Sequence, residues 1–160
     1  MSRSNFRCRL MAASLVGGAV LTGGLAQAAP GDDWPNYGND RGAMRYSPLT
    51  QITPANVTSL KVAWTYHMKP ADATRVATSE TTPLVVGNVM YLGSPYGRIV
   101  ALDATTGKEL WTFRLAASIY GTPLTYRGKS GKQYVAAVTT GGFWGDEPAG
   151  ADEVTAFALP

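Results

Sequence analysis

The sequence is poor in the residues that build metal and disulfide sites. Its 160 residues include a single cysteine, Cys8, and a single histidine, His67. One thiol excludes an intramolecular disulfide framework, and these two residues are too few for a zinc site of the cysteine–histidine type. We therefore interpret His67 as a solvated histidine at the end of a strand.

The chain also lacks an excess of charge of either sign once its beginning is set apart. Three of the 14 basic residues (Arg3, Arg7 and Arg9) lie in the first 28 residues, whereas all 11 acidic residues lie beyond them. The remainder therefore carries equal numbers of both charges. No basic surface for nucleic acid is expected from this balance, which argues against nucleic-acid binding.

The first 28 residues have the composition of an export signal. The three arginines precede an uncharged stretch from Leu10 to Leu25, and Ala26-Gln27-Ala28 is a small-residue cleavage site. We expect cleavage after Ala28 and export to a bacterial periplasm, where a protein without cysteines depends on packing for its stability. The alternative is that the stretch is retained and holds the chain at the inner membrane.

The rest of the chain shows strand patterns and no helix of useful length. Residues 29–60 are rich in Pro, Gly, Asn and Asp without a hydrophobic period, which predicts an extended segment. From residue 61 onward, short runs rich in β-branched and aromatic residues predict strands separated by turns such as Gly87-Asn88. The expected strands are 62–67, 82–86, 89–92, 98–102, 109–114, 122–126, 133–138 and 154–158.

Two short strings recur along the chain. Trp64-Thr-Tyr66 returns as Trp111-Thr-Phe113, and Thr82-Pro-Leu84 returns as Thr122-Pro-Leu124. Both spacings, of about 40 to 50 residues, suit repeats of one four-stranded sheet each, as in a β-propeller. Coincidence among common strand residues is the alternative for either pair taken alone.

A third motif links the third and fourth predicted strands of the first unit. It reads A-x-D-x-x-x-G-K-x-x-W, with Ala101, Asp103, Gly107, Lys108 and Trp111 at the defined positions. Gly107 supplies the positive φ that such turns need, and the Asp103 carboxylate can accept hydrogen bonds from amides of the turn. The string resembles the tryptophan-docking motif of pyrroloquinoline quinone (PQQ) repeats. This resemblance implies that Trp64 and Trp111 pack between neighbouring blades.

The resemblance extends to the PQQ-dependent alcohol and glucose dehydrogenases. Residues 33–38, 45–49 and 60–64 resemble the opening of that family, and residues 78–111 resemble its first full blade. Residues 121–126, 131–135 and 154–160 resemble the extreme C-terminus of its glucose dehydrogenase branch. The first blade thus runs directly into the last near Leu115–Gly121, whereas a closed propeller needs about four to eight blades.

The fold expected from this resemblance is all-β, a partial propeller of about two four-stranded antiparallel blades. One blade would span residues 82–114. The other would be composite, because in the family an N-terminal strand completes the last blade. Here that strand would be 62–67, beside the three strands within 122–158.

The resemblance also implies a small set of cofactor-binding residues. Glu80 lies where the family has a glutamate that contacts PQQ, and Gly142 and Trp144 lie in a loop that approaches the cofactor. The alternatives are an exposed glutamate at a strand edge and a tryptophan that caps its blade. The family's Ca²⁺ ligands and aspartate base come from blades that are missing here, so we assign no catalytic or metal-binding residue.

Three functional interpretations follow. The first is a fragment or internally deleted form of a periplasmic PQQ-dependent dehydrogenase, inactive as this chain alone. Its family implies a sugar or alcohol substrate, a quinone acceptor, and PQQ with Ca²⁺ as cofactors. The second is a non-catalytic β module that binds protein partners or self-associates through exposed blade edges. The third is a decayed gene product that scarcely folds.

Overall fold

The computed structural model describes residues 33–74, 76–140 and 151–160, and it contains two antiparallel sheets. The first sheet contains β1 (Leu84–Val86), β2 (Val89–Ser94), β3 (Arg98–Asp103) and β4 (Glu109–Arg114) in sequence order. The second contains β5 (Leu124–Arg127), β6 (Gln133–Thr139) and β7 (Glu153–Phe157), also in sequence order. The expectation of an all-β fold is confirmed.

Tight turns make this meander possible. Gly87 and Asn88 both have positive φ, 56° and 66°, as the two central residues of a type I′ hairpin turn require. Gly97 lies in the β2–β3 turn, also at positive φ, and its amide bonds to the Ser94 carbonyl at 3.2 Å. Because both turns are so short, consecutive strands pair directly.

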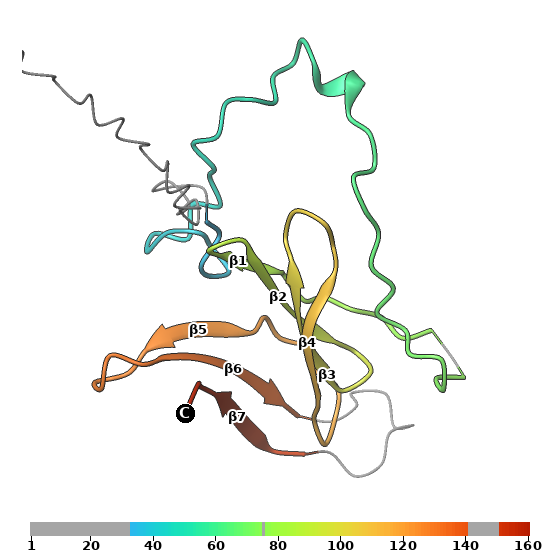
Figure 1. The fold of residues 1–160 in the computed structure, drawn as a ribbon, viewed down its shortest axis with the longest axis vertical. Coiled ribbons are helices and arrows are strands. Elements are labelled where there is room, and N and C mark those ends of the chain that lie inside the picture. Colours follow the sequence, from blue (N-terminus) through green and yellow to red (C-terminus); the bar gives the residue numbers. More distant parts are fainter. Residues whose placement is uncertain (1–32, 75, 141–150) are drawn as a thin grey trace, which may run out of the picture.

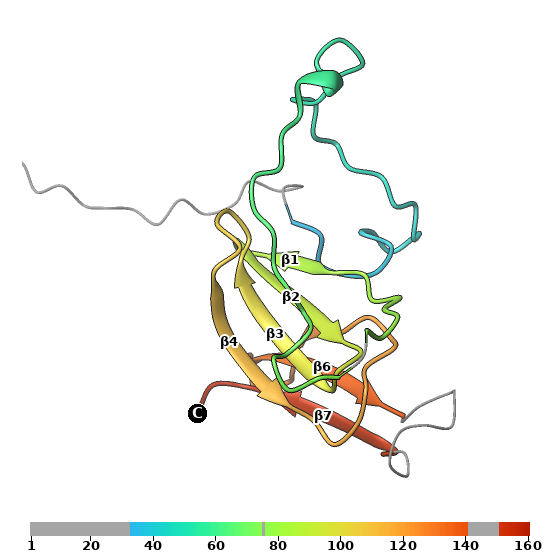
Figure 2. The same cartoon turned by 90° about the vertical axis from the view of Figure 1, so that its right-hand side faces the viewer.

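The segment before the first sheet is extended, with one 3₁₀ turn, η1 (Val57–Ser59). Its middle part, around η1, projects away from the two sheets (Figure 2). At its start, Trp34 forms a two-way backbone bridge with Val85, with N–O distances of 2.8 and 2.9 Å. This bridge covers part of the free edge of β1. Within the described ranges, no helix is long and apolar enough to cross a membrane.

Strand β3 is the centre of the core. Its residues from Ile99 to Leu102 are all buried, although neighbours along a strand point to opposite faces. Ile99 packs with Leu115, Ile119 and Ala137, on the face covered by the second sheet. Val100 and Leu102 pack on the other face, against the partly buried side chains of Trp64, Tyr66 and Met68.

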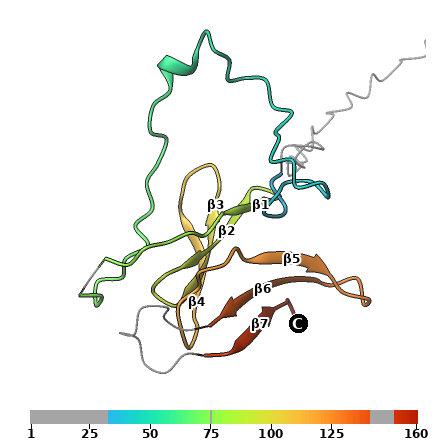
Figure 3. The same cartoon turned by 180° about the vertical axis from the view of Figure 1, so that it is seen from behind.

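The expected strand at 62–67 does not form, and among the described residues the second sheet has three strands instead of four. Residues 62–68 instead lie over the first sheet, where Arg98 Nη2 donates a 2.7 Å bond to the Met68 carbonyl. Figures 1 and 3 show this segment and the second sheet on opposite sides of the first sheet. The prediction of a composite blade is therefore wrong for a single chain, because the first sheet lies between residues 62–67 and the three strands that they were expected to join.

The connector from Leu115 to Gly121 holds the two sheets together. The Leu115 amide bonds to the Gly97 carbonyl at 2.7 Å, and the Ile119 amide bonds to the Ser94 carbonyl at 3.2 Å. Ile119 is 1% exposed and lies so close to Gly93 that a Cβ added there would be 2.5 Å from its Cγ2. The connector is therefore part of the core.

We expect Ile119→Ala to destabilise the chain by about 2–5 kcal/mol, because it leaves a cavity at the junction of the two sheets. Urea unfolding followed by tryptophan fluorescence would measure the change. Ile52→Ala is the matched control: Ile52 is 61% exposed, so its truncation should change stability by less than about 0.5 kcal/mol. Equal effects of the two substitutions would contradict the assigned packing.

Candidate functional site

The turn from Asp103 to Lys108 is held by its own hydrogen bonds. The Asp103 carboxylate accepts bonds from the Thr105 and Thr106 amides at 3.0 and 2.8 Å and from the Thr106 hydroxyl at 2.9 Å. Asn88 Nδ2 donates to it at 3.2 Å, and the Gly107 amide donates to the Asp103 carbonyl at 2.8 Å. The aspartate in this motif thus organises a loop.

These bonds also affect the acidity of Asp103. The Thr106 hydroxyl, followed by its backbone amide, lowers the pKa of the carboxyl below its ordinary value. A depressed pKa in the folded state means that the turn is stabilised while Asp103 is ionised. That contribution is present above the unfolded pKa and is lost as pH falls through the lowered folded value.

Trp64 packs directly on this turn. A Cβ added at Gly107, whose φ is +70°, would lie 2.6 Å from the indole ring, so only glycine allows this approach. The indole Nε1 donates a 3.2 Å bond to the Ala104 carbonyl. Two residues further on, the Tyr66 hydroxyl donates a 2.5 Å bond to Glu109. Burial, assisted by this carboxylate, raises the pKa of Tyr66 to about 12.

The Trp111 side chain lies on the face of the first sheet opposite to the face that Trp64 covers. Ala101, which is buried, pairs with Trp111 across β3 and β4. The Trp111 ring meets the Phe157 ring of β7 edge to face at a centroid distance of 4.9 Å. The Phe113 ring lies 5.0 Å from the Phe157 ring. The motif therefore contributes to both faces of the sheet. Lys108, its remaining member, has an exposed side chain.

These aromatic rings line a cavity of about 890 Å³ where the two sheets diverge. Its other lining residues are mostly apolar or small, with Tyr91, Lys132 and Gln133 as the polar exceptions. PQQ is a planar quinone with several acid groups, and one lysine and one amide do not match them. The cavity chemistry therefore does not fit that cofactor.

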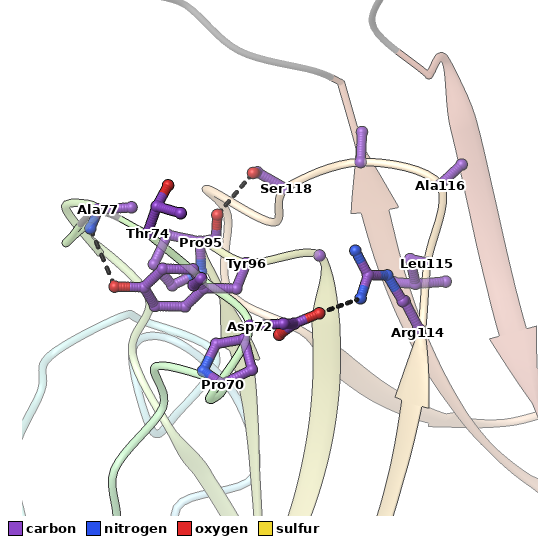
Figure 4. Close-up of a pocket in the computed structure, with 13 residues that line it drawn as sticks. Pro70, Asp72, Thr74, Ala77, Pro95, Tyr96, Arg114, Leu115, Ala116 and Ser118 are labelled. Carbon is purple, nitrogen blue, oxygen red and sulfur yellow. Dashed lines mark hydrogen bonds and ion pairs between the residues drawn. The ribbon is translucent and has the colours of Figure 1, made fainter. Parts of the chain in front are cut away.

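A second cleft, of about 410 Å³, lies between residues 70–74 with Ala77 on one side and the connector on the other (Figure 4). Asp72 and Arg114 form an ion pair across it at 3.6 Å, but both side chains are more than 70% exposed. Tyr96 accepts a 3.0 Å bond from the Ala77 amide, and the Ser118 hydroxyl donates to the Pro95 carbonyl at 2.6 Å. These polar groups already have partners within the chain, and their bonds hold the loops together.

Glu80 is exposed and lines neither of these cavities. It precedes the place where the two T-P-L repeats lie side by side, since the Thr82 amide donates to the Thr122 hydroxyl at 3.3 Å. Thr81 reinforces this junction through its hydroxyl, which donates to the Gly121 carbonyl at 3.4 Å. The carboxylate therefore lies at the end of both sheets where their first strands begin.

The other two predicted cofactor-binding residues, Gly142 and Trp144, lie outside the described residues. Within the described part of the chain, no three histidine, cysteine, aspartate or glutamate side chains gather into a potential metal site. Glu80 is the only predicted cofactor ligand whose position is described. The described residues thus do not assemble a site that fits PQQ with Ca²⁺.

Comparison with known proteins places the chain in a family. Residues 34–117 match the model of the PQQ-linked glucose/ethanol/alcohol dehydrogenase β-propeller domain. The chain belongs to this family. Its two sheets are therefore blades of a partial propeller, as the sequence predicts, and the docking motif lies in a blade of the quinoprotein type.

Individual members of the quinoprotein family are similar over about half of the chain. Quinoprotein glucose dehydrogenase A of Acinetobacter calcoaceticus is 43% identical over 94 residues, which cover 55% of this chain and 12% of that protein. The glycerol dehydrogenase large subunit of Gluconobacter oxydans is 41% identical over 97 residues, covering 58% and 13%. The chain thus spans about an eighth of the length of these curated relatives.

A solved structure of a europium-containing methanol dehydrogenase is also similar. Its identity is 38%, with a TM-score of 0.38, and the match covers 40% of this chain and 11% of that one.

Two contacts, one between aromatic rings and one a hydrogen bond, could not be predicted from the sequence. Phe157 was recognisable only as a strand residue, and its contact with Trp111 depends on how the two sheets face each other. The Tyr66–Glu109 bond joins residues 43 positions apart. The only available signal is the recurrence of an aromatic residue two positions after each motif tryptophan.

We expect Gly107→Ala to destabilise the chain more than Gly87→Ala does. Both glycines have positive φ, so each substitution carries a backbone strain of about 1–3 kcal/mol. Only at Gly107 does the new Cβ also collide with Trp64, because nothing lies within 4 Å of a Cβ at Gly87. Urea unfolding would give both free energies, and tryptophan fluorescence would report the displaced indole. Equal destabilisation with unchanged fluorescence would contradict the docking role.

Proposed function

We propose that the chain is a fragment or internally deleted form of a periplasmic PQQ-dependent dehydrogenase and is inactive by itself. The supporting observation is the contrast between its family membership and its described side chains. Residues 34–117 match the dehydrogenase propeller, yet no cofactor or metal site converges in the described structure. The chain's similarity to its relatives concerns a part of the scaffold only.

The chemistry of the full-length family explains why a partial scaffold is insufficient. The resemblance implies that bound Ca²⁺ and PQQ would supply a Lewis acid and the oxidant, that an aspartate would act as the base for the sugar or alcohol, and that a second quinone would be the final electron acceptor. Glu80 is exposed in this chain. One solvated carboxylate does not enclose a cofactor. It also does not provide the several oxygen ligands that Ca²⁺ takes.

The location that we propose rests on the first 28 residues. The arginines at its start, the uncharged stretch and Ala26-Gln27-Ala28 form the three parts of an export signal. Export would place the chain where the family meets sugars, alcohols and the membrane quinone.

A second candidate function is that of a non-catalytic β module that binds proteins or copies of itself. The outer side of the second sheet favours it, because Leu124, Val138 and Val154 are between 44% and 73% exposed there. Apolar side chains gathered on one face mark an interaction surface more often than isolated ones do.

We expect the purified chain to show no PQQ-dependent reduction of a redox dye with glucose, ethanol or glycerol in the presence of Ca²⁺. Titration of PQQ should also leave the protein fluorescence unchanged apart from inner-filter effects. The quinoprotein glucose dehydrogenase of Acinetobacter calcoaceticus, reconstituted in parallel, is the positive control. Dye reduction that requires both PQQ and this chain would overturn the proposed inactivity.

Expression of residues 1–160 in a bacterium would test the location. We expect the chain in the periplasmic fraction, with a mass that corresponds to an N-terminus at Ala29. Replacing Ala28 by a bulky residue, as in Ala28→Phe, should block cleavage and leave the longer form at the membrane. An uncleaved wild-type chain in the cytoplasm would refute export.

A further inference from the structure

The outer face of the second sheet is apolar and, apart from the buried Ala136, exposed or partly exposed. Strand pairing places Leu124 beside Ala136 and Ala156, Tyr126 beside Tyr134, and Val138 beside Val154, all on one side. The opposite side, with Val135, Ala137 and Phe157, packs against the first sheet. Tyr126 and Tyr134 stack at 5.1 Å, and Val154 is 73% exposed. The sheet therefore has one buried and one unpartnered face.

The same sheet also has an unpaired edge. In the first sheet, β3 is followed by a fourth strand, β4, whereas β7 is the last strand of the second sheet. Across residues 33–74, 76–140 and 151–160, no strand pairs with the outer edge of β7. Free N–H and C=O groups on such an edge are ready to pair with another chain.

A strand sequence without a sheet occurs elsewhere in the chain. Trp64-Thr-Tyr66 repeats Trp111-Thr-Phe113, which lies in β4, the fourth strand of the first sheet. Residues 62–68 nevertheless pair with no strand, and Val62 is 83% exposed. One side of this segment is already used, because Trp64, Tyr66 and Met68 pack on the first sheet.

This segment cannot reach β7 of its own chain. It lies on the Val100 and Leu102 face of β3, whereas the second sheet lies on the Ile99 face. Its docking on Gly107 and the Arg98–Met68 bond hold it there. A strand that is anchored in this way can complete the second sheet only of another molecule.

We propose that residues 62–69 of one copy pair with β7 of a second copy as its fourth strand. The internal repeat gives the register. In the first sheet, Ala101 lies between Tyr91 and Trp111 in adjacent strands. Phe157-Ala158 in the second sheet corresponds to Val100-Ala101 in the first. The β6–β7 register places Ala158 opposite Tyr134, just as Ala101 lies opposite Tyr91. Trp64 of the first copy then lies opposite Ala158 of the second copy.

The antiparallel register that follows is complementary in charge and polarity. It places Tyr66 opposite Ala156, Met68 opposite Val154, and Lys69 opposite Glu153. Both members of the lysine–glutamate pair are exposed in the single chain. The apolar face around Leu124, Tyr126 and Val138 would then pack against the Trp64 side of the neighbouring copy. The same contact would therefore pair the free edge of β7 and bury the exposed face of the sheet.

Such an interface is heterologous, because the surfaces that it joins belong to different sides of the molecule. Repeated contacts of this kind form a closed ring if the rotation per copy allows it, and a filament otherwise. With two sheets per copy and about four to eight sheets in closed propellers, a ring would contain about two to four copies. The proposal deepens the second candidate function, and the dye assay on the same preparation tests the first independently.

Light scattering coupled to size-exclusion chromatography tests the assembly. We expect the wild-type chain to elute as a multimer of defined mass and Val154→Lys to elute as a monomer with an unchanged circular dichroism spectrum. Val76→Lys is the matched control, because Val76 is 83% exposed and belongs neither to residues 62–69 nor to the second sheet; this variant should remain multimeric. A wild-type monomer at all concentrations, or equal behaviour of the two variants, would overturn the proposal.

Cysteine pairing tests the register. Residues directly opposite each other in adjacent antiparallel strands lie within disulfide range, and the register pairs His67 with Thr155. In a Cys8→Ser background, a mixture of His67→Cys and Thr155→Cys chains of different tag length should give an oxidised heterodimer. Ala156→Cys in place of Thr155→Cys should give little, because its side chain points to the other face. No mixture-specific heterodimer, or an equal yield with Ala156→Cys, would refute this pairing.

Discussion

The two-sided burial of β3 is the constraint on which the rest of the structure depends. Four consecutive residues, from Ile99 to Leu102, are at most 5% exposed, so each face of this strand must be covered by a different part of the chain. The second sheet covers one face and the Trp64 segment covers the other. Without both coverings, the first sheet would expose a row of aliphatic side chains to water.

This arrangement separates two parts of the chain that the repeat pattern relates. Residues 62–68 resemble a fourth strand, and the second sheet has no fourth strand within the described part of the chain, but the first sheet lies between them. Membership of the quinoprotein family thus explains the scaffold, the docking turn and the order of the strands. Function in such a scaffold depends on side chains that converge from several blades, which is a separate question from the fold.

Local features were predictable from sequence because their causes are local. Gly87-Asn88 and the Asp103–Lys108 turn require particular backbone conformations that only a few residue types adopt, and both turns form as predicted. The face on which residues 62–68 pack was not predictable in this way. Alternation predicts which side chains share a side of a strand, whereas the choice of neighbouring sheet depends on the short connector at 115–121. Glu80 illustrates the same limit, since a motif gives its position but not its surroundings.

The connector itself has a consequence for how proteins of this kind change in evolution. Its backbone hydrogen bonds, from Leu115 to Gly97 and from Ile119 to Ser94, are all made to the turn of the sheet that it leaves. The sheet that follows takes no part in these backbone bonds and meets the connector through side chains, since Ile119 packs with Ala137. A different following repeat could therefore keep the backbone bonds of the joint, provided that its inner face also fits Ile119.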